Sequence, residues 1–147
     1  MADWRDELRQ AIEGDQSARK SAAETRQAAE ERGHAWLVAV VEPALQEVKA
    51  ELERLGRSAE VNVGTRSASI TIRHGGTEEL RFTVVADGVR PYPKIRGYDR
   101  GRAYESEGTF RSGAQDYTID DIGKDEIIRK AVSEFRQTVE TRRLRGE

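Results

Sequence analysis

Residues 52–63, Leu-Glu-Arg-Leu-Gly-Arg-Ser-Ala-Glu-Val-Asn-Val, contain the point at which the hydrophobic period of the chain changes. Before Gly56, apolar residues recur every three or four positions, at Leu37, Val41, Leu45, Val48, Leu52 and Leu55. After it they recur every two, at Val61, Val63, Ala68, Ile70, Ile72, Leu80, Phe82 and Val84. The first spacing is typical of one stripe of a helix, and the second of one face of a sheet. The sequence therefore predicts an α+β fold, in which a long N-terminal helical region packs on an antiparallel sheet of about four to six strands, closed by a C-terminal helix.

The helical region divides into three predicted parts. Residues 3–13 read as a short helix, and Gly14-Asp15-Gln16-Ser17 is expected to interrupt it, because glycine is permissive and Asp or Ser can cap a new helix. Residues 18–32 carry only alanines as apolar residues and are interpreted as an exposed helical arm. In the helix expected over 34–55, Pro43 predicts a kink or a restart, and Gly56 is a suitable C-terminal cap. We divide the chain into a helical arm, 1–32, and an α+β domain, 33–147.

Strands are expected near 59–63, 67–74 and 79–86, the last two joined by a tight hairpin at Gly75-Gly76. Pro91 and Pro93 predict that 89–96 is an edge strand or an extended loop. A turn at 99–102 would join 94–98 to 102–110, and a short strand near 115–119 could follow. The final helix is expected over 124–142. Its predicted buried stripe is Ile128, Ala131, Val132, Phe135 and Val139.

Composition narrows the function classes. The 147 residues are 35% charged and 36% hydrophobic, with a net charge of −2, which argues against a surface devoted entirely to nucleic acid. The absence of cysteine excludes disulfides and thiolate chemistry. The acidic start has no apolar segment typical of a signal peptide, and the longest apolar run, 35–41, is far too short to span a membrane. Arginine outnumbers lysine 20 to 5, which suggests a GC-rich bacterial genome, and we expect a cytoplasmic protein.

A basic segment at 90–104 interleaves cations and tyrosines, and five bases against one acid give it a balance of +4. Positive charge follows phosphates and aromatic rings stack on bases, so this composition suits single-stranded nucleic acid. The alternative is an arginine-rich edge hairpin whose charges discourage edge-to-edge pairing. The residues that would bind nucleic acid are Arg90, Lys94, Arg96, Tyr98, Arg100, Arg102 and Tyr104.

An acidic segment at 114–126 has the opposite sign. Its acids are Asp116, Asp120, Asp121, Asp125 and Glu126, against the single base Lys124. Clustered carboxylates can hold Mg²⁺ or Ca²⁺, but the spacing fails the calcium-loop pattern, so turn and capping roles are preferred and no metal or cofactor is expected. His34 and His74 lack the spacing of a zinc helix, and no hydroxyls or carboxylates are ordered as a catalytic group. A hydrolase that uses these acids is therefore the least favoured function class.

Part of the apolar surface of the N-terminal helices must cover the sheet, and any remainder would need a partner, because exposed apolar strips mark interfaces. The alternative is that all of it packs within one chain. The predicted interface residues are Trp4, Leu8, Ile12, Trp36 and Val40. We therefore expect a small non-enzymatic interaction or adaptor protein that self-associates, as a homodimer, through its N-terminal helices. The alternative is a nucleic-acid-binding protein that uses the basic segment.

Overall fold

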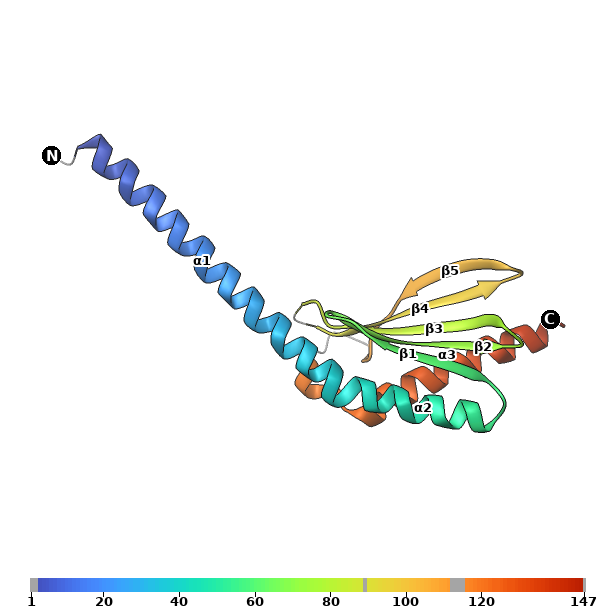
Figure 1. Ribbon diagram of the computed structural model, residues 1–147. Coiled ribbons are helices and arrows are strands. Elements are labelled where there is room, and N and C mark those ends of the chain that lie inside the picture. The colour runs from blue at the N-terminus through green and yellow to red at the C-terminus, as the bar shows by residue number, and fades with distance from the viewer. Residues whose placement is uncertain (1–2, 89, 112–115, 147) are drawn as a thin grey trace.

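The computed structural model describes residues 3–88, 90–111 and 116–146. Helix α1 (Trp4–Trp36) continues through a π-helical turn, η1 (Leu37–Val41), into α2 (Glu42–Arg54). Five strands follow: β1 (Ser58–Val63), β2 (Ser67–His74), β3 (Thr77–Val85), β4 (Tyr92–Asp99) and β5 (Arg102–Glu107). A 3₁₀ turn, η2 (Ile119–Asp121), precedes helix α3 (Lys124–Leu144). The strands form an antiparallel sheet in the order β1-β2-β3-β4-β5, with α2 and α3 on the same face, which confirms the α+β fold (Figure 1).

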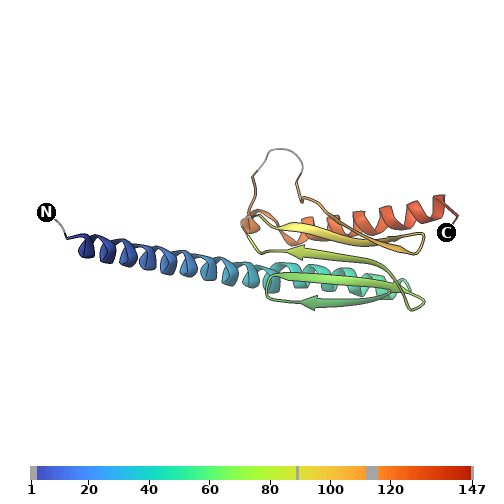
Figure 2. The same cartoon turned by 90° about the horizontal axis from the view of Figure 1, so that it is seen from above.

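Helix α1 is a single helix of 33 residues that extends well beyond the sheet (Figure 2). The predicted interruption at Gly14–Ser17 is wrong, because the helix passes through these residues without a break. A glycine inside a helix costs only about 1 kcal/mol relative to alanine, and its neighbours favour helix. An ion pair between Asp15 and Arg19 at 3.0 Å also bridges the position where the break was expected.

Pro43 lies in the first turn of α2, which confirms the predicted restart. The π-helical turn before it shifts the hydrogen bonding, so that the Glu42 amide donates to the Leu37 carbonyl, five residues earlier. Proline has no amide hydrogen and is best accommodated where a helix begins. The wide turn thus accommodates the proline at the point where the helical axis bends from α1 into α2 (Figure 1).

Glycines with positive φ lie where the chain reverses direction, after α2 and between β2 and β3. Gly56 has a φ of 95° and ends α2 as predicted: its amide donates to Glu53, and the Arg57 amide donates to Leu52. In the β2–β3 turn, Gly75 and Gly76 have φ values of 61° and 81°, as a tight hairpin requires. The predicted hairpins at 74–77 and 99–102 are therefore confirmed.

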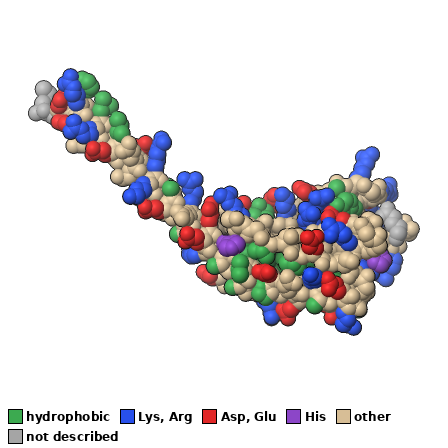
Figure 3. All heavy atoms as spheres, viewed as in Figure 1, with side chains coloured by type: hydrophobic (Ala, Val, Ile, Leu, Met, Phe, Trp, Pro, Cys, Tyr) green, Lys and Arg blue, Asp and Glu red, His purple; other side chains and the backbone are tan. Residues whose placement is uncertain are grey.

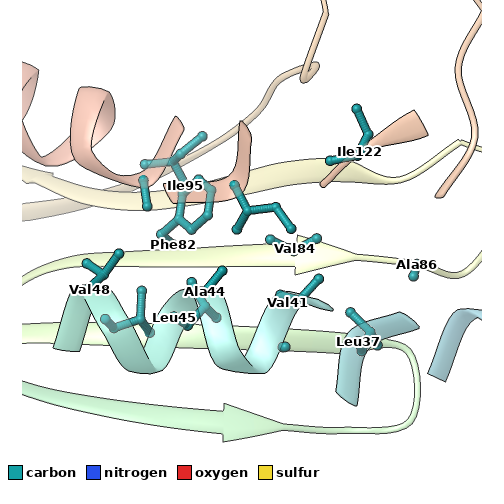
Figure 4. Packing of buried hydrophobic residues seen from close by; sticks show 14 of the residues in the cluster. Leu37, Val41, Ala44, Leu45, Val48, Phe82, Val84, Ala86, Ile95 and Ile122 are labelled. Carbon is teal, nitrogen blue, oxygen red and sulfur yellow. The ribbon is translucent and has the colours of Figure 1, made fainter. Parts of the chain in front are cut away.

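The core lies between the sheet and the two helices. As predicted, Ile70 pairs with both Val61 and Phe82 on the face that the helices cover. Phe82 is completely buried, helix α2 packs over β1 and β2, and α3 packs over β3; Figure 4 shows members of this core on α2, on β3 and at Ile95. The largest fully buried residues include Leu37, Leu45, Ile70, Ile72, Leu80, Phe82, Tyr117, Ile122 and Ile127.

After β3, the structure differs from two predictions, an edge strand or loop at 89–96 and a short strand near 115–119. Residues 92–96 belong to β4, an inner strand paired with β3 and β5, and form neither an edge strand nor a loop. The backbone of Pro93 faces β5, and the Pro93 carbonyl accepts a hydrogen bond from the Gly108 amide at 2.9 Å, just beyond the last paired residue of β5. Because the backbone of Pro93 points away from β3, its missing amide hydrogen costs no hydrogen bond to that strand. Residues 116–119 form no strand, whereas residues 89 and 112–115 lie outside the described part of the chain.

The buried stripe of α3 is rotated from its predicted position. Ile127, which the prediction omitted, is fully buried together with Ala131, whereas Val132 is 47% exposed. Ile128 and Phe135 are partly buried against the core. Helix α3 must contact both α2 and β3, so its covered side is the one between those two elements.

Candidate interaction surfaces

The free part of α1 carries an exposed apolar strip. Every residue from 3 to 29 is exposed. Trp4, Leu8 and Ile12 recur every four residues, so they lie on one side of the helix, and they are 59%, 54% and 54% exposed. Figure 3 shows this apolar strip near the free end of the helix.

The base of α1 is held firmly against the domain. Arg66 forms an ion pair with Glu30 at 2.8 Å. Gly33 lies so close to β3 that an added Cβ would be 2.9 Å from the carbonyl oxygen of Ala86. Helix α1 is therefore anchored at one end and exposed along its other 26 residues, at 4–29.

The other two predicted interface residues are covered by their own chain. Trp36 is only 8% exposed, and its indole donates to the Ile122 carbonyl at 3.1 Å. Val40 is partly buried against the core. The exposed apolar surface is thus limited to Trp4, Leu8 and Ile12 among the five predicted residues.

The structure separates the residues of the basic segment. Lys94, Arg96 and Tyr98 alternate on β4 and face away from the helices. Arg102 and Tyr104 lie on β5 and line a cleft of about 580 Å³ between β4, β5 and α3. Tyr104 pairs with Gly97, the residue before Tyr98, so the rings of Tyr98 and Tyr104 lie on opposite faces of the sheet and cannot stack together on one strand of nucleic acid. Arg100 is in the β4–β5 turn, and Arg90 precedes β4.

Carboxylates accompany most of these cations. Glu78 accepts a hydrogen bond from the Tyr98 hydroxyl and lies 3.5 Å from Arg96. The hydrogen bond with Tyr98 and the charge of Glu78 raise the pKa of Arg96. Lys94 lies 3.9 Å from Glu105 on the neighbouring strand. The outer face of β4 therefore carries mixed charge.

Residues of the acidic segment take capping and ion-pairing roles. Asp121 accepts a hydrogen bond from the Thr118 amide at 2.8 Å and so caps the turn η2. Arg90 pairs with Asp116 at 2.7 Å, which joins the basic and acidic segments. Arg111 donates to Glu126, and this hydrogen bond lowers the pKa of the Glu126 carboxyl. Among the described residues, no group of three or more His, Cys, Asp or Glu side chains is placed to hold a metal ion.

The histidines take no part in a shared site. The His34 Nδ1 lies 3.1 Å from the Gly64 carbonyl, and His74 is exposed next to the β2–β3 turn.

In the part of the chain that the structure describes, no helix combines the length and the apolar character needed to cross a membrane.

A buried charge cluster was missed by the sequence analysis. Glu79 is 4% exposed and binds Arg57 at 2.9 Å and Arg142 at 2.7 Å, one arginine on each carboxylate oxygen. Its position coincides with an irregularity in the β2–β3 register, where Ile72 pairs with Leu80 but Arg73 pairs with Glu78. The consecutive acids Glu78 and Glu79 are the only trace of this bulge in the sequence, and they do not reveal the partners.

Comparison of the chain with protein-family models, with curated proteins and with solved structures finds no match.

Proposed function

We propose that this chain is a non-enzymatic interaction protein that self-associates through helix α1. The proposal rests on one observation: Trp4, Leu8 and Ile12 are exposed together on a stretch of helix, residues 4–29, in which every residue is exposed. Full burial of one large apolar side chain contributes roughly 1.5–3 kcal/mol. A partner that covers this strip would therefore gain several kcal/mol, as expected of an interface.

The anchored base of α1 gives the strip a fixed direction. The Glu30–Arg66 ion pair and the close approach of Gly33 to Ala86 hold the helix where it leaves the domain. The rod then presents the strip at a distance from the sheet. This geometry suits a protein that joins two folded bodies.

The nucleic-acid alternative has less support. It placed Tyr98 and Tyr104 in one binding segment as stacking residues, but they lie on opposite faces of the sheet. The Glu78 and Glu105 carboxylates beside Arg96 and Lys94 would also repel phosphates.

Analytical ultracentrifugation of the full chain tests the proposal. We expect a mass of twice the 16.5 kDa chain at micromolar concentration. A variant with Leu8→Gln and Ile12→Gln should sediment as a monomer, because two of the exposed apolar side chains are lost. The matched control is Leu144→Gln, which changes a residue that is 87% exposed at the opposite end of the molecule and should leave the mass unchanged. A monomeric full chain at high micromolar concentration would refute the proposal.

A further inference from the structure

The free part of α1 is asymmetric in charge. Residues 3–15 contain five carboxylates and two arginines, a balance of −3. Residues 18–30 contain three bases and two carboxylates, a balance of +1. Two such helices side by side in the same direction would place −3 against −3, whereas the opposite direction places −3 against +1.

The same part of α1 is asymmetric in side-chain size. A stripe with alternating spacings of four and three residues runs along the helix, as in the seam of a coiled coil. The stripe comprises Trp4, Leu8, Ala11, Asp15, Ala18, Ala22, Thr25 and Ala29, and the exposed Ile12 lies at its edge, next to Ala11. Its bulky apolar members lie in the N-terminal half, and its C-terminal half contains only small residues.

We infer that the partner of α1 is the α1 helix of a second copy, packed antiparallel so that residues 4–29 of the two chains overlap. This inference rests on the proposed self-association and adds its geometry. In this register the seam residues meet in pairs: Trp4 opposite Ala29, Leu8 opposite Thr25, Ala11 opposite Ala22, and Asp15 opposite Ala18. Trp4 and Leu8 then each pack on a small residue, so no two bulky side chains of the seam meet, and the central pairs contain no bulky apolar residue.

A parallel pair lacks this complementarity. Trp4 would meet Trp4 and Leu8 would meet Leu8 at one end, while alanines met alanines at the other. The bulky end would hold the small end too far apart for contact. The antiparallel overlap also matches the exposed length, because the seam ends at Ala29, just before Glu30 binds Arg66. The overlap is roughly 40 Å long, at about 1.5 Å per residue.

Oxidative cross-linking tests this geometry, because the chain has no cysteine of its own. Two variants, Ala11→Cys and Ala22→Cys, each place one thiol in the seam. We expect an equimolar mixture of the two to form a disulfide-linked dimer, and each variant alone to remain uncrosslinked. The matched control mixes Gln10→Cys with Ala23→Cys, which occupy the same level of the helix but point away from the seam. This mixture should not cross-link.

The outcomes separate the two proposals. If Ala11→Cys and Ala22→Cys each cross-link alone, the helices are parallel, and the inference is overturned although self-association stands. If ultracentrifugation shows a dimer but neither the mixture nor the single variants cross-link, α1 does not pair with α1, and the inference is again overturned. If the full chain is a monomer, both the inference and the proposed function fail.

Discussion

Replacement of Glu79 should destabilise the fold far more than replacement of an exposed acid. Its carboxylate is held by Arg57, which follows α2, and by Arg142, which lies near the end of α3, so one side chain ties three elements together. Loss of one partner of a buried pair typically costs 3–5 kcal/mol. The two arginines here are 29% and 35% exposed and regain some hydration, which places the expected loss for Glu79→Ala lower, at about 2–3 kcal/mol.

Urea denaturation followed by circular dichroism measures this loss directly. Glu79→Gln keeps the shape but loses the charge, and should cost about 1–2 kcal/mol, because hydrogen bonds between charged groups are stronger than those to a neutral amide. The control is Glu60→Gln, which breaks an exposed pair with Arg73 at 3.3 Å and should cost less than about 1 kcal/mol. Equal losses for Glu79→Gln and Glu60→Gln would refute the reasoning that burial makes the Glu79 cluster important.

Two further predictions concern the core and the acid range. Phe82→Ala should lower the free energy of unfolding by about 3–5 kcal/mol, because Phe82 is completely buried, whereas Thr83→Ala on the outer face should change it little; a loss below about 1 kcal/mol would contradict the core assignment. The hydrogen bond from Arg111 lowers the pKa of Glu126 in the folded protein. The Glu126 carboxylate therefore stabilises the fold at any pH above its pKa in the unfolded chain. This stabilisation disappears as the pH falls through the pKa of Glu126 in the folded protein. Glu126→Gln should therefore be less stable than the wild type at neutral pH and indistinguishable from it in strong acid, and a pH-independent difference between the two would contradict this assignment.

Local pattern was sufficient for most of the sheet because its strands pair with their neighbours in the sequence. The positions of Gly75 and Gly76 define a hairpin, and the alternation at Ile70 and Phe82 defines the covered face. The errors arose where a distant contact decides the structure. Pro93 predicts an edge strand or an extended loop, but its backbone faces β5 just beyond the last paired residue of that strand. The missing amide hydrogen of Pro93 therefore costs no hydrogen bond to β3.

The candidate interface shows the same limit. Trp4 and Trp36 both belong to apolar stripes on a helix, although charged residues flank Trp4 and the apolar run 35–41 contains Trp36. Trp36 is buried where its indole donates to the carbonyl of Ile122, 86 positions away, whereas Trp4 is 59% exposed. The pattern identifies residues that can be buried, and the chain topology decides which of them its own domain covers.

Length explains why α1 has an uncovered end. Strand β3, with nine residues, is the longest strand of the described chain and spans roughly 30 Å, whereas the 33 residues of α1 alone span roughly 50 Å. A helix of that length can be covered by this sheet only if it folds back on itself, and the predicted interruption at Gly14–Ser17 would have allowed that. Because the helix continues through Gly14, residues 4–29 extend away from the described part of the domain, with the apolar strip near their free end. The continuity of the helix through Gly14 therefore explains why Trp4, Leu8 and Ile12 are left exposed.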